Sequence, residues 1–243
     1  MTDVKPSPSR NDLLVFLPTY NEAGNVEEMI RRIKEMKTRA DILFIDDNSP
    51  DGTGTMLDRL SRQEGGIDVI HRPSRGGIGS AHRQALRYAY QKRYKKLITM
   101  DADGTHAPED IPGLLQLTGK ADVVVGSRFL TGASDSRTKR EKLASRLSHL
   151  ATSFMLGLPY DLTNAFRLYH LDTIDPAAFS GVQADDYAFF IESIYALEKK
   201  GVRIVEYPVS LSARLSGKSK MRFRDMLWWG GKLMSLRWAD KYN

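Results

Sequence analysis

The sequence predicts one α/β domain, built on a mostly parallel sheet with helices on both faces. Short apolar runs alternate with segments of helical apolar spacing over roughly the first 125 residues, and the connections between them are short. The runs at 13–17 and 42–45 are apolar at every position, as strands are when both faces are buried. The 243-residue chain, with 41% hydrophobic and 27% charged residues, is long enough for such a domain and has an ordinary globular composition.

The elements are expected in the following order. Strands are predicted at 13–17, 42–45, 67–70, 97–100 and 123–125. Between them, apolar side chains recur every three or four residues and predict helices at 26–36, 56–60, 81–90 and 109–118. After this series we predict a basic amphipathic helix at 135–156, a strand at 166–169, a helix at 188–197 and a strand at 202–209.

The composition also excludes several classes of protein. The chain has no cysteine, so disulfides and thiolate chemistry are excluded and nothing indicates secretion. No window approaches the ~18 apolar residues of a membrane span, so no transmembrane segment is expected. We expect a flexible N-terminus over residues 1–11, a main domain over 12–213 and a basic C-terminal segment over 214–243.

The C-terminal segment 214–243 carries the whole net charge of +6, because it has eight Lys or Arg against two Asp. An anionic partner is therefore expected there. The same segment holds all three tryptophans among Met, Phe and Leu residues. It is predicted to form an amphipathic helix, which either lies in a membrane interface or packs on the domain's own sheet.

The most informative strand end is that of the run 97–100, which is followed by Asp101, Ala102 and Asp103. Alternate side chains of an extended chain point the same way, so the two carboxylates can converge. A hard divalent cation such as Mg²⁺ would relieve their repulsion and share its other ligands with phosphates and water. This predicts a metal–diphosphate site at the carboxyl edge of the sheet. The alternative is that one Asp caps the next helix and the other is solvated.

Polar or flexible sequence also follows the first three strands, at residues 18–22, 46–49 and 76–79. Each could be ordinary loop chemistry, but together they favour one binding crevice. The glycine loop 76–79 does not follow the first strand and lacks the G-x-G-x-x-G spacing, and no phosphate-binding P-loop motif occurs. Neither a dinucleotide site nor a P-loop is therefore expected.

Four further places carry chemistry. Asp185 and Asp186 precede the helix at 188–197, where they either offset the helix dipole or provide a base, with Glu192 as a second candidate. Arg128 follows the fifth strand and could reach phosphates or be solvated. The segment 214–220 contains Arg214 and Lys220 and suits closure over a diphosphate, or it is a disordered linker.

Taken in order, these motifs resemble those of a known family. They are Pro-Thr-Tyr-Asn-Glu at 18–22, Asp-Asp-x-Ser-x-Asp-Gly-Thr at 46–53, Asp-Ala-Asp at 101–103, Gly-Ser-Arg at 126–128, Asp-x-Thr-x-x-Phe-Arg at 161–167 and Arg-x-x-Gly-x-Ser-Lys at 214–220. The chain resembles the polyprenyl (dolichol)-phosphate mannosyltransferases, inverting family 2 glycosyltransferases of the GT-A fold. The resemblance covers about residues 12–221.

The resemblance implies a nucleotide-sugar site and a divalent metal, Mg²⁺ or Mn²⁺. The residues implied at the nucleoside are Pro18, Tyr20, Glu22, Ile45 and Asp47. Those implied at the diphosphate and metal are Asp101, Ala102 and Asp103, with Thr105 as a further possible ligand. Arg128, Arg214 and Lys220 are implied at the phosphates, with 214–220 as a lid. Catalytic roles are expected for Asp103, Arg128 and Asp186.

The implied reaction moves a hexose, mannose from GDP-mannose, to a polyprenyl phosphate at the cytoplasmic face of a membrane, by an enzyme in peripheral contact with that surface. At three places the sequence departs from the usual pattern of that family: Gly-Thr at 104–105, Asn-Ala at 164–165 and the acidic pair at 185–186. The last favours a different family 2 enzyme, which uses a UDP-sugar or a saccharide acceptor with Asp186 as base. The same sheet pattern also suits a sugar-phosphate nucleotidyltransferase, and the basic tail also suits a nucleic-acid or membrane-binding module; no nucleic-acid partner is expected.

Overall fold

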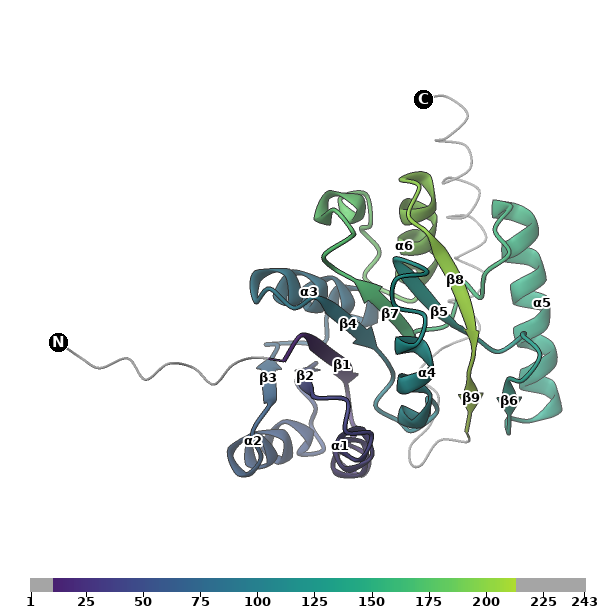
Figure 1. The fold of residues 1–243 in the computed structure, drawn as a ribbon. Coiled ribbons are helices and arrows are strands. Elements are labelled where there is room, and N and C mark those ends of the chain that lie inside the picture. The colour runs from purple at the N-terminus through teal and green to yellow at the C-terminus, as the bar shows by residue number, and fades with distance from the viewer. Residues whose placement is uncertain (1–10, 213–243) are drawn as a thin grey trace.

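A computed structural model describes residues 11–212, and its centre is a seven-stranded sheet (Figure 1). The strands lie in the order β3-β2-β1-β4-β7-β5-β8. Their bounds are β1 Leu13–Thr19, β2 Ala40–Asp46, β3 Ile67–His71, β4 Lys96–Thr99, β5 Val123–Ser127, β7 Arg167–His170 and β8 Ile204–Pro208. β7 is antiparallel to β4 and β5, and the other neighbouring strands are parallel. The predicted mostly parallel α/β sheet is confirmed.

Helices cover both faces of this sheet (Figure 1). One apolar core lies under α1 (Val26–Glu35), α2 (Thr53–Gln63) and α4 (Ile111–Leu115). A second core lies under α3 (Ile78–Gln91) and α6 (Ala188–Lys199). The strands divide between the two cores by alternation, as in β1, where Val15 faces the first core and Phe16 the second. Each face is therefore covered by apolar packing, and the strand ends are left open to solvent and ligands.

Several element boundaries differ from the sequence-based expectation. The helix expected at 109–118 is a 3-10 turn, Pro108–Asp110, followed by the short α4. The basic helix is α5, Lys139–Leu156; it begins four residues later than expected because Thr138 and Glu141 form a capping box that fixes its start. A second 3-10 turn spans Pro176–Phe179. The small ladder between β6 (Ser134–Asp135) and β9 (Ser210–Leu211) was not expected.

Some expectations lie outside the described residues. These are the flexible N-terminus up to residue 10, the lid residues Arg214 and Lys220, and the amphipathic C-terminal helix. Among the residues that are described, none of the helices is long and apolar enough to cross a membrane.

Candidate active site

A cleft opens at the carboxyl ends of β1, β2 and β4, on the side of the sheet covered by α3 and α6. β1 lies between β2 and β4 in the sheet. After β1 the chain continues toward β2, and after β4 it continues toward the opposite edge of the sheet. Open α/β sheets bind ligands at such a point, where the strand order reverses. Residues from five separate segments meet there. The cleft is lined by Pro18, Thr19, Tyr20, Glu22, Asp47, Arg75, Gly77, Ile78, Ala81, Asp101, Ala102, Asp103, Asp186 and Tyr187.

The two neighbouring carboxylates at the end of β2 have different roles. Asp46 is buried and accepts hydrogen bonds from Thr19 Oγ1 at 3.1 Å and from the Ser49 amide at 3.0 Å, so it fixes the turn. Asp47 lines the cleft, forms an ion pair with Arg72 and accepts from the Gly77 amide at 3.3 Å. Of the two, Asp47 is therefore the one placed to meet a ligand.

Tyr20 and Arg75 form one wall of the cleft. The Arg75 guanidinium carbon lies 4.5 Å from the centroid of the Tyr20 ring, a cation–π contact. Arg75 was not among the residues expected in the site. It gives this wall a flat, cationic surface that suits a nucleobase or a phosphate.

The loop after β4 brings both predicted metal carboxylates into the cleft. Asp103 is buried, and its Oδ1 accepts from the Thr105 amide at 3.0 Å and from Thr105 Oγ1 at 2.6 Å. The Asp101 amide donates to His106 Nδ1 at 2.9 Å. His106 is buried and bridges to Leu211, so the loop is held from both ends. Thr105 braces Asp103 and does not itself line the cleft.

These donors fit a hard divalent cation that keeps part of its shell for a substrate. Within residues 11–212, no cluster of three or more His, Asp or Glu side chains could hold a metal on its own. Asp101 and Asp103 nevertheless line one cleft and offer two carboxylates. Mg²⁺ and similar ions are commonly bound by one or two carboxylates, with phosphate oxygens and waters completing the octahedron.

Asp186 enters the cleft because the glycine loop packs against the segment before α6. The amide of Gly79 donates to the Asp185 carbonyl at 2.8 Å. A Cβ at Gly77 would lie 2.3 Å from that carbonyl oxygen, so only glycine allows the approach. Arg83 forms an ion pair with the exposed Asp185 side chain. Asp185 thus anchors the segment, while Asp186 faces the cleft and accepts from the Ala188 amide at 2.9 Å.

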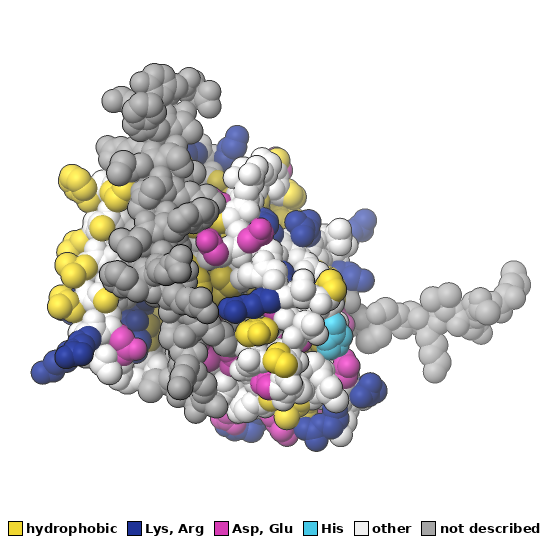
Figure 2. Space-filling view, turned by 180° about the vertical axis from the view of Figure 1, so that it is seen from behind, with side chains coloured by type: hydrophobic (Ala, Val, Ile, Leu, Met, Phe, Trp, Pro, Cys, Tyr) yellow, Lys and Arg dark blue, Asp and Glu magenta, His cyan; other side chains and the backbone are white. Residues whose placement is uncertain are grey.

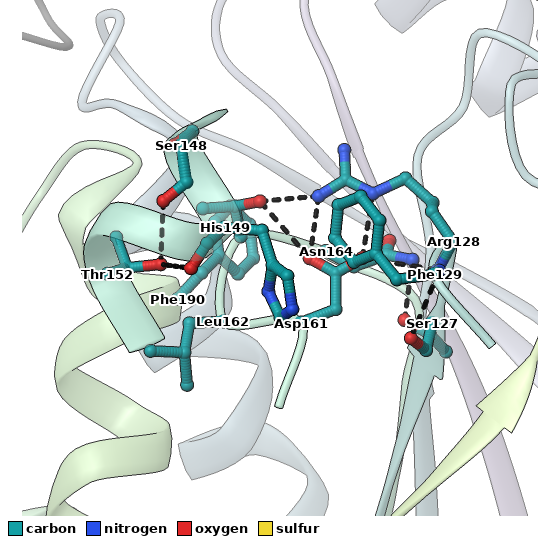
Figure 3. Close-up of polar contacts among 12 residues, drawn as sticks. Ser127, Arg128, Phe129, Ser148, His149, Thr152, Asp161, Leu162, Asn164 and Phe190 are labelled. Carbon is teal, nitrogen blue, oxygen red and sulfur yellow. Dashed lines mark hydrogen bonds and ion pairs between the residues drawn. The ribbon is translucent and has the colours of Figure 1, made fainter. Parts of the chain in front are cut away.

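Arg128 lies beside the cleft, outside its lining residues, and is bound to a buried carboxylate (Figure 3). Its Nε and one terminal nitrogen donate to Asp161 at 2.7 and 2.6 Å, and it also donates to Thr163. Burial favours the neutral acid, yet the Arg128 charge and hydrogen bonds hold the pKa of Asp161 below its usual value. Figure 3 also shows the His149 ring against Phe129, with ring centroids 4.2 Å apart.

The cleft therefore gathers most of the predicted residues: Pro18, Tyr20, Glu22, Asp47, Asp101, Ala102, Asp103 and Asp186. Ile45 is absent from the lining because its side chain packs in the core. Glu192 is also absent; it accepts from the amides of Gln183 and Ala184 and holds that loop. The glycine loop is visible in the sequence. Gly77 and Gly79 lie at the start of α3, and this pair of glycines could have indicated that the backbone before α6 approaches the loop closely.

Comparisons with known proteins show which family the chain resembles. The family model described as "Glycosyl transferase family 2" matches residues 14–185. The undecaprenyl-phosphate mannosyltransferase of Micrococcus luteus is 34% identical over 212 residues, which cover 86% of this chain and 87% of that protein. The polyprenol monophosphomannose synthase of Mycolicibacterium smegmatis is 33% identical over 212 residues, 86% of this chain and 80% of that one.

Solved structures support the fold. Glucosyl-3-phosphoglycerate synthase of Mycobacterium tuberculosis, in complex with Mn²⁺, UDP and glucosyl-3-phosphoglycerate, has a TM-score of 0.62 at 17% identity, over 91% of this chain and 77% of that one. A mannosyltransferase of Pyrobaculum calidifontis, in complex with GDP-Man and Mn²⁺, has a TM-score of 0.54 at 20% identity, over 88% and 61%. With its GT-A fold and its match over most of the domain, this chain belongs to glycosyltransferase family 2.

Proposed function

We propose that this enzyme transfers mannose from GDP-mannose to a polyprenyl phosphate, with inversion at the anomeric carbon and with Mg²⁺ or Mn²⁺. The observation that carries the proposal is the meeting of Asp47, Asp101, Asp103 and Asp186 in one cleft at the strand ends. The two mannosyltransferase relatives that cover most of the chain support mannose and a polyprenyl acceptor.

Each side chain has a role in this reaction. Asp47 would bind the nucleobase, held in place by Arg72 and the Gly77 amide. Asp101 and Asp103 would hold the metal, which when bound neutralises the charge of the departing nucleoside diphosphate. Arg75 would add a cation at the cleft wall. Arg128, Arg214 and Lys220 remain our candidates for phosphate contacts.

The acceptor decides whether a general base is needed. A phosphate monoester has a second pKa of about 6, so it is already largely anionic near neutral pH and can attack without a base. A sugar hydroxyl would need one. Asp186 lines the cleft, and this favours a second candidate function: transfer from a UDP-sugar or to a saccharide, with Asp186 as base.

A lipid acceptor places the reaction at a membrane surface. We therefore infer a peripheral enzyme on the cytoplasmic membrane face, in keeping with a sequence that contains no cysteine.

A thermal-shift panel tests the donor and the metal. A ligand that binds only the native state raises the melting temperature. GDP and GDP-mannose are expected to raise it when Mn²⁺ is present, and to do so much less after chelation. A shift with UDP-sugars alone would favour the second candidate function. No shift with any nucleotide would contradict both. Asp103→Asn, with the metal carboxylate neutralised, should lose the Mn²⁺-dependent part and keep its fold.

A further inference from the structure

Helix α5 presents a row of exposed apolar side chains. Of the five large apolar side chains that are exposed in the described part of the chain, four lie on α5. They are Leu143, Leu147, Leu150 and Phe154, with exposed fractions of 60, 59, 64 and 86%. Their separations of four, three and four residues place them on one side of the helix, and we call them the α5 stripe. Figure 2 shows hydrophobic side chains gathered along the edge of the molecule that α5 forms.

Helix α5 is fixed at both ends and along the side opposite the stripe. α5 begins at a capping box and ends at Gly157, which has the left-handed backbone that stops a helix. Its other side is seated on the domain, where Thr152 is buried and the His149 ring stacks on Phe129. The stripe is therefore held outward on a fixed support. A contiguous exposed apolar row of this kind marks an interaction surface.

Charge indicates what covers the stripe. α5 carries Lys139, Arg140, Lys142 and Arg146 against Glu141, a net charge of +3. A second copy docked through the same stripe would bring two such helices together, and like charges repel. The basic segment 214–243, with a net charge of +6, is disfavoured for the same reason. An anionic surface is favoured, and one that also receives Leu and Phe side chains is a lipid bilayer.

We propose that the α5 stripe docks the enzyme on an anionic bilayer. Its four apolar side chains enter the headgroup region, and the four basic residues near the start of the helix meet lipid phosphates. The inference deepens the proposed function, since it rests on a lipid acceptor for its purpose. It also links docking to the site, because His149 on α5 contacts Phe129, the neighbour of Arg128.

A single label tests the surface directly, because the chain has no native cysteine. Leu147→Cys, in the full chain, is labelled with a nitrobenzoxadiazole dye and mixed with vesicles of phosphatidylcholine containing phosphatidylglycerol. Emission is expected to shift to the blue and rise at least twofold, and brominated lipid is expected to quench it. Arg62→Cys, on the exposed surface of α2, is the control and should not change. If the protein binds the vesicles while the emission of the dye at position 147 stays unchanged, the proposal is overturned.

A second variant tests the energetics. Replacing Leu143, Leu147 and Leu150 together by Ser is expected to lower vesicle partitioning at least tenfold without lowering the melting temperature, because these side chains are already exposed. Unchanged partitioning, or a label signal that depends on protein concentration without vesicles, would overturn the proposal; the latter would indicate a second copy instead.

An activity split separates this proposal from the proposed function. The triple variant should keep its transfer rate on a short-chain, water-soluble polyprenyl phosphate and lose it on a long-chain acceptor in vesicles. Equal loss on both would contradict the docking role. If the unmodified enzyme transfers no sugar to either acceptor, the proposed function is contradicted. The change in dye emission on vesicles would still support membrane docking.

Discussion

Replacing Gly79 by alanine should displace Asp186 from the cleft. Gly79 lies in the first turn of α3, where the glycine loop meets the segment before α6. A Cβ there would lie 2.4 Å from the Ala184 carbonyl oxygen and 2.6 Å from that of Asp186. Contacts of this kind are essentially never shorter than 3.0 Å, so the closer one must open by about 0.6 Å.

Two opposing effects set the size of the change in stability. In a helix, alanine is favoured over glycine by about 1 kcal/mol. Overpacking a tight contact typically costs about 1–3 kcal/mol, and here the two nearest obstacles are backbone atoms that cannot rotate away, with the Phe189 Cβ at 2.8 Å as a third. We therefore expect a net loss on the order of 1–2 kcal/mol, a drop of several degrees in melting temperature. Asp186 lines the cleft and would position the acceptor whether or not it also acts as a base. Because a misplacement of about 1 Å can lower a rate by about 10²-fold, we expect turnover to fall at least about tenfold.

The assay compares transfer rate and melting temperature of Gly79→Ala with those of Gly181→Ala. An added Cβ at Gly181 has nothing within 4 Å, so this control should leave both quantities unchanged. Binding of GDP, measured in parallel, should be affected less than turnover, because Asp47 does not belong to the displaced segment. A Gly79→Ala enzyme with normal turnover, or with a raised melting temperature, would refute the idea that this contact positions Asp186.

Three further perturbations address the metal, the core and the pH dependence. Asp103→Asn should reduce turnover on the order of 10²–10³-fold, because a charge that holds the metal is lost; retained activity in a rate assay would contradict the metal assignment. Arg167→Met should destabilise the fold by about 3 kcal/mol or more in urea unfolding, since the buried guanidinium donates to the carbonyls of Leu162, Asn164 and Phe190; a loss under about 1 kcal/mol would show that the carbonyls find other donors. Asp122→Asn should cost about 1 kcal/mol near neutral pH, less than a fully buried pair because Arg203 is largely exposed. Hydrogen bonds from Arg203 lower the pKa of Asp122 to about 2, so the wild-type advantage should be present above about pH 4 and vanish as the pH falls through about 2; a pH-independent difference would show that the ion pair is not its source.

Much of the fold could be predicted from sequence because its signals are local. The continuous apolar runs of β1 and β2 require burial on both faces, and the spaced apolar residues of α1 require a helix. The direction of β7 has no local signal, since the sequence of a four-residue strand does not show whether it runs parallel or antiparallel to its neighbours. The ladder between β6 and β9 has two residues in each strand, too few for any period to show. The exposure of the α5 stripe could not be foreseen either, because the same spacing is normal for a helix that packs on a core.

The site could be predicted as a set of strand ends, but not in the detail of individual side chains. Asp46 and Asp47 are adjacent in sequence, and only the fold shows that the first fixes a turn while the second lines the cleft. Arg75 enters through a contact with Tyr20 across two loops, which no linear motif records. The contact of Ile45 with the nucleoside remains a prediction. Because its side chain lies in the core, only its backbone could make that contact.

The most direct test of the proposed mannosyl transfer is product formation from GDP-mannose labelled in the sugar, with a polyprenyl phosphate as acceptor and Mn²⁺ or Mg²⁺ present. We predict that label moves into the lipid phase as a mannosyl phosphate of inverted configuration, and that chelation of the metal stops it. Label that stays on the nucleotide with this acceptor, while a saccharide acceptor or a UDP-sugar donor supports transfer, would contradict this function, and transfer to a saccharide hydroxyl would call for Asp186 as general base.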